Sequence, residues 1–220
     1  DLAGVYRDQG QLDEALALYL EILPYTERED NQENIGNTYN NMGIVYGLQG
    51  KLDLALEYCA KALEIRIAAL GEKDIRVGDT YNNMGSVYQN QGKLDLALEY
   101  YAKDLEIYIT AYGGEKHPRV GDTYNNMAIV YRKQGNLDLA LEYYAKALKI
   151  YIMALGENHP SLGDTYNNMA IVYENQGKLD LALEYYAKAL EIKIAALGEK
   201  HPSVGDTYNN MAIVYGDQGK

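Results

Sequence analysis

The segment DTYNNMAIVY occurs three times in this chain, at residues 122–131, 164–173 and 206–215. Two near copies precede them, DTYNNMGSVY at 79–88 and NTYNNMGIVY at 37–46. The threonine of this segment recurs at intervals of 42, 43, 42 and 42 residues. Repetition at such a period indicates an array in which one small structural unit is stacked many times.

The repeated units are nearly identical, since residues 123–164 and 165–206 differ at only 8 of 42 positions. The one longer interval contains an additional glycine at Gly113–Gly114. Because the chain begins inside one unit at Asp1 and ends inside another at Lys220, we expect a fragment of a longer array. We predict a single repeat domain over 1–220, with units at about 1–37 (partial), 38–79, 80–122, 123–164, 165–206 and 207–220 (partial).

Each unit has the pattern of two amphipathic helices joined by a turn. In residues 165–206, the segment NQGK at 175–178 interrupts the apolar pattern, and Gly177 suits the left-handed position that closes a helix. Apolar residues spaced i, i+3, i+4, i+7 predict a first helix before this turn, and a longer series predicts a second helix of about five turns after it. The first series is Tyr166, Met169, Ala170 and Tyr173, and the second is Leu179, Ala182, Leu183, Tyr186, Ala189, Leu190, Ile194 and Leu197.

One helix pair cannot cover its own apolar faces, whereas stacked pairs can. We expect Gly198 to end the second helix, and Pro202 to begin the next unit, where the missing N–H of proline costs nothing. The pattern therefore predicts an all-α fold, a right-handed α-solenoid of stacked antiparallel helix pairs. Counted along the chain, it predicts eleven helices, of which the first is incomplete.

Composition limits the classes of function. The chain has a net charge of −12, which disfavours nucleic acids and anionic membranes as partners, because Lys and Arg are needed to bind their phosphates. Apolar residues never form a run long enough for a transmembrane helix. A single cysteine, Cys59, excludes a disulfide framework and is typical of a reducing compartment, so we expect a cytoplasmic, intracellular protein.

The aromatic and small residues of each unit resemble the tetratricopeptide repeat, with its Leu-Gly-like pair and tyrosine in the first helix and Ala-x-x-x-aromatic in the second. The usual period of that family is 34 residues. The longer period here, the Asn-Asn pair and a His-Pro turn are similar to the repeats of kinesin light chains. HEAT-type repeats have a similar period but do not predict these tyrosine and alanine positions. The resemblance is carried in one unit by Tyr166, Met169, Ala170, Tyr173, Ala182 and Tyr186, and four other units agree with it.

Two adjacent asparagines lie in the middle of every first helix. On a helical wheel they fall away from the side formed by the tyrosines, methionine and alanine. The resemblance implies that first helices line the concave wall of the solenoid, where the asparagines would form two parallel rows. Asparagine offers both a hydrogen-bond acceptor and donors, as a peptide bond does. The first row is Asn40, Asn82, Asn125, Asn167 and Asn209, and the second row is Asn41, Asn83, Asn126, Asn168 and Asn210.

The expected function is a non-catalytic scaffold that binds extended peptide segments in this groove through the asparagines. Residues at two further positions beside the rows indicate that the groove prefers peptide segments with apolar and basic side chains. They are the isoleucines Ile44, Ile129, Ile171 and Ile213, and the aspartates Asp79, Asp122, Asp164 and Asp206. Two structural alternatives remain open. In the first, the asparagines only bridge neighbouring helices; in the second, each aspartate is only a favourable charge near a helix N-terminus. A functional alternative is a structural array that self-associates end to end into superhelical assemblies.

Other polar residues do not indicate catalysis. The histidines His117, His159 and His201 each precede a proline in equivalent turns, whereas catalysis needs one asymmetric group of residues. Histidines one repeat apart are also too distant to share a metal ion. We therefore predict turn residues, and no enzyme activity, cofactor or metal site.

Two substitutions distinguish individual units. Asp104 stands where equivalent positions carry alanine, and a buried carboxylate there requires a hydrogen-bond partner or a local shift. Cys59 stands where other units carry a tyrosine, and we predict that it is a buried packing residue and not a nucleophile.

Overall fold

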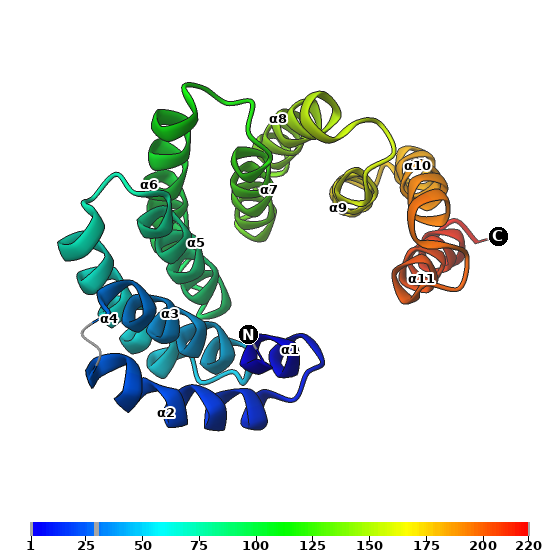
Figure 1. Ribbon diagram of the computed structural model, residues 1–220. Helices are drawn as coiled ribbons and strands as arrows, with labels where there is room; N and C mark the ends of the chain where they lie inside the picture. Colours follow the sequence, from blue (N-terminus) through cyan, green and yellow to red (C-terminus); the bar gives the residue numbers. More distant parts are fainter. Residues whose placement is uncertain (1, 29–30, 220) are drawn as a thin grey trace. The chain divides into compact units, whose positions relative to one another are not determined.

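The computed structural model describes residues 2–28 and 31–219. Asp1 and Lys220, at which the interrupted units were expected to begin and end, lie outside these residues. Within the described residues the chain forms eleven α-helices and no β-strand (Figure 1), which confirms the predicted all-α class. The helices are α1 (Leu2–Asp8), α2 (Leu12–Arg28), α3 (Gln32–Leu48), α4 (Leu52–Leu70), α5 (Ile75–Asn90), α6 (Leu94–Tyr112), α7 (Pro118–Lys133), α8 (Leu137–Leu155), α9 (Pro160–Asn175), α10 (Leu179–Leu197) and α11 (Pro202–Asp217).

The chain divides into two compact units, Asp1–Gly113 and Gly114–Lys220. In the first unit α3 packs on α4 and α5 on α6, and in the second α7 packs on α8 and α9 on α10. Successive pairs stack through α4 and α5 and through α8 and α9. The division falls at the additional glycine, where Gly113 and Gly114 have positive φ values of 66° and 146°.

The turn inside each pair has the predicted geometry. Gly177 has a φ of 72°, and across it the N–H of Lys178 donates to the carbonyl oxygen of Tyr173 at 2.9 Å. This is the Schellman closure, which satisfies a carbonyl group left free at the end of the helix. The second helix that follows, α10, has 19 residues, in agreement with the expected five turns.

The histidines cap the N-termini of first helices. The Nδ1 atoms of His117, His159 and His201 accept hydrogen bonds from the N–H group two residues later, at 3.2, 3.3 and 3.3 Å. Asp74 makes the equivalent bond to the N–H of Arg76 at 2.9 Å before α5. An acceptor at this position satisfies one of the unpaired N–H groups of the first turn. The predicted turn role is therefore confirmed and has a physical cause.

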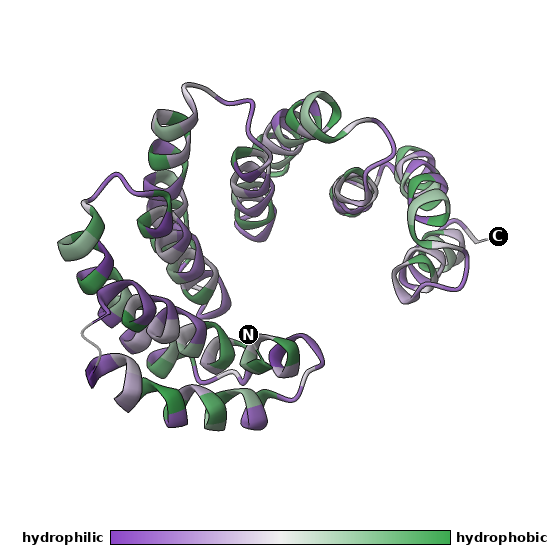
Figure 2. Cartoon of the chain, viewed as in Figure 1, coloured by the Kyte–Doolittle hydropathy of each residue, from purple (hydrophilic) through white to green (hydrophobic). Residues whose placement is uncertain are grey.

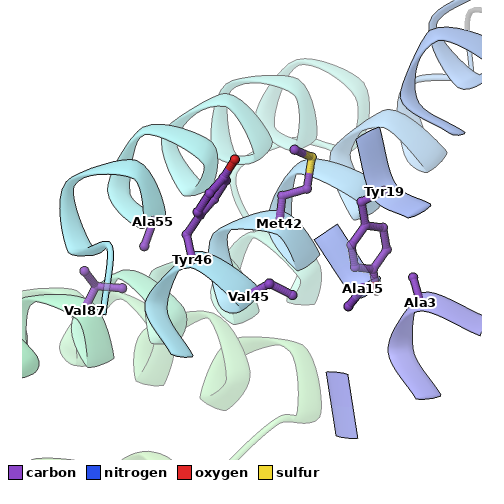
Figure 3. Close-up of a cluster of buried hydrophobic side chains, with 8 residues drawn as sticks. All are labelled: Ala3, Ala15, Tyr19, Met42, Val45, Tyr46, Ala55 and Val87. Carbon is purple, nitrogen blue, oxygen red and sulfur yellow. The ribbon is translucent and has the colours of Figure 1, made fainter. Parts of the chain in front are cut away.

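Apolar residues on facing sides of the helices form the core. Figure 2 shows that the helices carry both hydrophilic and hydrophobic residues, as amphipathic packing requires. In the second unit Ala170, Ala182, Tyr186 and Val214 form a buried cluster. The larger cluster of the first unit, drawn in Figure 3, consists of Ala3, Ala15, Tyr19, Met42, Val45, Tyr46, Ala55 and Val87.

Candidate functional site

The predicted site residues lie on the first helices, α3 and α5 in the first unit and α7, α9 and α11 in the second. First helices contact one another directly within each unit, α3 with α5 and α7 with α9. Within each unit, we call the side of these helices that carries the second-row asparagines and the isoleucine position the first-helix face. The two asparagine rows have different surroundings.

First-row asparagines bridge neighbouring first helices. Asn40 is buried, with 7% of its surface exposed, and its Oδ1 accepts a hydrogen bond from Nδ2 of Asn83 at 3.0 Å. The Oδ1 of Asn125 accepts a bond from the hydroxyl of Thr165 at 3.4 Å. The helical wheel placed both asparagines away from the packing surfaces. For Asn40 that placement is wrong, because the next first helix lies against it.

The same bridge recurs between α9 and α11. Oδ1 of Asn167 accepts hydrogen bonds from the hydroxyl of Thr207 at 3.3 Å and from Nδ2 of Asn210 at 3.4 Å. The first row thus contributes acceptors to contacts within the stack, as the structural alternative proposed. Each such bond contributes about 0.5–1.5 kcal/mol net.

Asn82 makes a different contact, within its own helix pair. Its Nδ2 donates to Oδ2 of Asp104 at 2.8 Å, and Asp104 is only 1% exposed. The buried carboxylate therefore has the hydrogen-bond partner that the sequence required. The first-row asparagine of this unit is therefore hydrogen-bonded to the second helix of its own pair, through the aspartate that replaces alanine.

The second row keeps part of its surface accessible. Asn41, Asn83, Asn126, Asn168 and Asn210 are all partly exposed. In the first row only Asn40 is buried, since Asn82, Asn125 and Asn167 are partly exposed and Asn209 in the last helix is exposed. Asn83 and Asn210 use one N–H of the carboxamide in the bridges to the first row. Beside the row, Ile44, Ile129 and Ile171 are partly exposed and Ile213 is 56% exposed.

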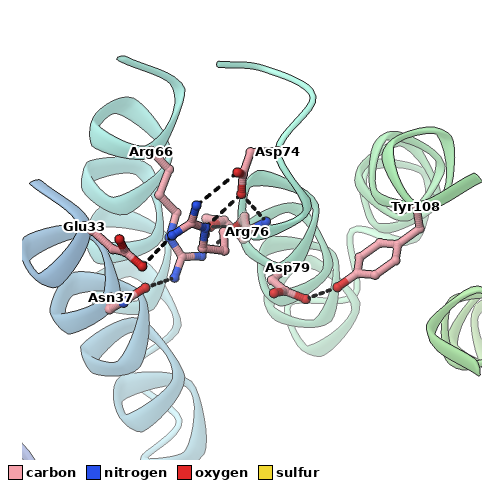
Figure 4. A network of polar contacts seen from close by, with 8 residues as sticks. Glu33, Asn37, Arg66, Asp74, Arg76, Asp79 and Tyr108 are labelled. Carbon is pink, nitrogen blue, oxygen red and sulfur yellow. Dashed lines mark hydrogen bonds and ion pairs between the residues drawn. The ribbon is translucent and has the colours of Figure 1, made fainter. Parts of the chain in front are cut away.

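The aspartates are bonded to the second helix of their own pair. Asp79 accepts a hydrogen bond from the Tyr108 hydroxyl at 2.7 Å (Figure 4), and Asp122 accepts one from the Tyr151 hydroxyl at 2.8 Å. Burial, and then the charge of Asp122, raise the pKa of Tyr151 above its ordinary value.

Asp164 has a cationic partner in place of a tyrosine, since its Oδ1 lies 3.0 Å from the Lys193 ammonium group. Asp206 is exposed. The carboxylates at Asp79, Asp122 and Asp164 are thus oriented by groups of the chain itself.

Arg66 in α4 occupies the position equivalent to Tyr108, Tyr151 and Lys193. Sequence analysis did not single it out. Arg66 is 5% exposed, and Nη2 donates to Oδ1 of Asn37 at 2.8 Å (Figure 4). Its Nη1 donates to the carbonyl oxygen of Arg76 at 2.6 Å and to the hydroxyl of Thr80 at 2.8 Å. Burial lowers the pKa of Arg66, and the charge of Asp79 opposes that effect. The guanidinium group joins α4 to both neighbouring first helices.

A second set of cross-links was also missed. The glutamine after each of α3, α5, α9 and α11 donates its side-chain N–H to the aspartate near the start of the preceding second helix. Both residues recur with the period of the repeat, which was the available signal. The pairs are Gln49–Asp13 at 2.7 Å, Gln91–Asp53 at 3.0 Å, Gln176–Asp138 at 3.1 Å and Gln218–Asp180 at 2.8 Å.

The described residues contain no group of three His, Cys, Asp or Glu side chains that could hold a metal ion. Nor does any described helix have the length and apolar character needed to cross a membrane. Cys59 is buried, and burial raises the pKa of its thiol to about 12, so the thiol is neutral near pH 7. Because the thiolate is the nucleophilic form, this supports the expected packing role.

The tetratricopeptide repeat family model matches residues 1–68, 34–108, 76–153, 120–195 and 161–220. The chain belongs to the tetratricopeptide repeat family. Its structure is similar to that of BtubC (BKLC) from P. vanneervenii, with a TM-score of 0.79 and 22% identity over 94% of this chain and 84% of that one. These likenesses confirm the predicted class of stacked helix pairs.

Two structures of a putative kinesin light chain from Podosopora anserina, with nearly identical TPR-like repeats, are also similar. One gives a TM-score of 0.69 and 19% identity over 89% of this chain and 93% of that one. The other gives 0.68 and 20% identity over 83% and 86%. At these identities the likeness establishes the fold alone. Comparison with curated protein sequences finds no match.

Proposed function

We propose that this tetratricopeptide repeat chain is a non-catalytic protein-interaction scaffold that binds an extended peptide segment along the first-helix face. The second-row asparagines carry the proposal, because each of α3, α5, α7, α9 and α11 has one such residue, and all five are partly exposed. A carboxamide can accept from a peptide N–H and donate to a peptide C=O. Contacts of this kind hold a backbone without selecting its side chains.

The spacing of the row suits an extended chain. Packed helices lie about 8–10 Å apart, and an extended chain advances about 3.3 Å per residue. One asparagine would therefore meet about every third residue of the guest. With a net contribution of about 0.5–1.5 kcal/mol for each bond, and a cost for ordering the guest, we expect weak to moderate affinity.

The charge of the protein favours basic guests. The chain carries a net charge of −12, which attracts cationic segments over a distance that shrinks with salt. The aspartate row attracts basic guests less strongly than the sequence suggested. Asp164 already has an ion pair with Lys193, and Asp79 and Asp122 already accept hydrogen bonds from tyrosine hydroxyl groups. The isoleucine position offers apolar contact between the asparagines. We expect guests that combine basic and apolar residues.

Replacing Asn41, Asn83 and Asn168 together with alanine tests this function. Peptides are first selected from a random library on the parent protein, and their affinity is then measured by isothermal titration calorimetry. We expect at least a tenfold loss of affinity while the far-ultraviolet circular dichroism is unchanged. The control is Gln176→Ala, which removes a cross-link on another edge of the stack and leaves the asparagines intact. Unchanged affinity in the folded triple variant would remove the asparagines from the binding site.

A second candidate function is end-to-end self-association, favoured by exposed apolar side chains on the outermost helices. Leu2 and Val5 of α1 are 59% and 50% exposed, and Tyr208 and Tyr215 of α11 are 47% and 42% exposed. The equivalent of Tyr215 in α9, Tyr173, packs on a tyrosine of the following helix. A second copy would cover these side chains with exposed apolar residues of its own outermost helices.

Sedimentation velocity across a hundredfold range of concentration tests this candidate. Association predicts a sedimentation coefficient that rises with concentration in the parent and stays constant in Tyr208→Lys/Tyr215→Lys. A constant monomer value for the parent would exclude it.

A further inference from the structure

A pocket opens between α3, α4 and α5, entirely within the first compact unit. Its volume is about 120 Å³. Small side chains from all three helices line it: Gly43 and Gly47 of α3, Cys59 of α4 and Ser86 of α5. Ile44 and Asn83, which belong to the first-helix face, line it as well. We call this pocket the Cys59 socket.

The equivalent place in the second unit carries larger side chains. The residues that correspond in α7, α8 and α9 to the four small ones are Ala128, Arg132, Tyr144 and Ile171. Tyr144 is completely buried. Every one of the four differences makes the side chain of the first unit smaller, although the residues come from separate parts of the sequence. Their convergence on one point leaves room for a group that the chain does not supply.

The socket approaches the size of a site that holds an aromatic ring, and its lining is mainly apolar. A dry apolar cavity of about 150 Å³ inside a protein accepts benzene. The thiol of Cys59 is neutral and acts as a small apolar group. The chain also shows what fits, because Tyr101 and Tyr186 are buried at the position that Cys59 occupies.

We propose that the Cys59 socket receives one aromatic side chain of a peptide that lies along the first-helix face. A guest backbone held by the Asn83 carboxamide passes directly over the socket, since Asn83 lines it. The socket thereby gives one repeat a side-chain preference that the asparagines alone do not provide. This inference rests on the proposed function for its guest, but the socket itself can be tested separately.

The variant Cys59→Tyr fills the socket with the side chain of the other repeats. It is expected to fold, because a glycine already makes room for the ring. Gly43 corresponds to Gly85, which lies so close to the Tyr101 ring that a Cβ atom on it would be 2.8 Å from a ring atom. Ser86→Ile is a second blocking variant, which introduces the residue found at Ile171.

The first experiment uses indole as the probe and follows the methyl resonances of Ile44 and Val87 by NMR. Saturable shifts are expected in the parent and not in Cys59→Tyr or Ser86→Ile. Absence of shifts in the parent, or equal shifts in all three proteins, would refute the claim that the Cys59 socket binds an aromatic ring.

The second experiment selects decapeptides from a random library on the parent. We expect enrichment of Phe, Tyr or Trp at one position. Replacing that residue with alanine should lower affinity at least tenfold for the parent and less than twofold for Cys59→Tyr.

Peptides that bind the parent and Cys59→Tyr equally, without an aromatic preference, overturn this inference and leave the proposed function standing. If indole binds the parent selectively but no peptide binds at all, the proposed function fails and the ring-sized socket remains.

Discussion

The layer of α3, α4 and α5 and the layer of α7, α8 and α9 are built on the same motif but have different centres. In the first layer Cys59 leaves a pocket and Arg66 joins the helices with a buried charge. In the second, Tyr144 fills the centre and the Tyr151 hydroxyl donates a hydrogen bond to the carboxylate of Asp122. The shared apolar residues determine that helices form and stack. The few positions that vary determine which polar groups are bonded internally and which space stays open.

The largest expected effect on stability comes from placing the small residue of the first layer, cysteine, at the equivalent position of the second layer. Tyr144→Cys removes a fully buried ring, and we expect a loss of about 3–4 kcal/mol in the free energy of unfolding. Urea denaturation measures this loss. The reciprocal change, Cys59→Tyr, fills an existing pocket and should cause no loss. Equal effects of the two substitutions would show that the layers do not differ in packing.

Arg66→Ala should cost about 3 kcal/mol, because it leaves Asn37, Thr80 and a backbone carbonyl group without their buried donor. Arg66→Lys should recover much of that loss, since Lys193 occupies the equivalent position with a bond to Thr207 at 3.4 Å. Urea denaturation of both variants checks the pair. A loss below about 0.5 kcal/mol for Arg66→Ala would mean that the cross-link contributes little beyond its own desolvation.

Alkaline pH should lower the free energy of unfolding of the first layer, because the buried Cys59 thiol resists ionisation in the folded chain. The pKa of its thiol is raised from 9.0 to about 12 in the folded chain, so stability is fully present below pH 9 and falls as pH rises towards 12. At pH 10 the expected loss is about 1.4 kcal/mol relative to pH 7. Cys59→Ala should lack this component when the two proteins are unfolded in urea at both pH values. The same pH dependence in both proteins would contradict the assignment.

Tyr151→Phe should have the smallest effect, about 1 kcal/mol, because it removes one hydroxyl bond to the partly exposed Asp122. The raised pKa of Tyr151 adds a pH signature: its contribution is present below about pH 10 and declines above it. The variant should therefore lose less stability than the parent above pH 10. Thermal unfolding between pH 8 and pH 11 measures both quantities.

Much of the fold was predictable because it depends on local chemistry repeated many times. Helix periodicity located both helices of each pair, and Gly177 marked the turn between them. The sequence indicated that a buried Asp104 needs a hydrogen-bond partner. It did not identify Asn82 as that partner, since Asn82 lies on another helix. The capping role of His117 was visible in principle, because Asp74, a common N-cap residue, occupies the same position.

The candidate site was less predictable because it depends on contacts between helices. A helical wheel describes one helix, whereas the burial of Asn40 is caused by α5 lying beside α3. The Arg66 cross-link joins residues on three helices, and the Cys59 socket is likewise lined from three. No periodicity within one segment reveals such convergence. A comparison of equivalent positions between repeats does reveal the substitutions that cause it.

We infer that first-row asparagines hold the stack while second-row asparagines bind the guest. Side-chain amide NMR of protein labelled with ¹⁵N-asparagine, titrated with a library-selected peptide, tests it most directly. We expect the carboxamide resonances of Asn41 and Asn168 to shift to saturation, while those of Asn40 and Asn167 stay in place. Saturation of the protein with peptide while the Asn41 and Asn168 resonances remain unmoved would contradict it.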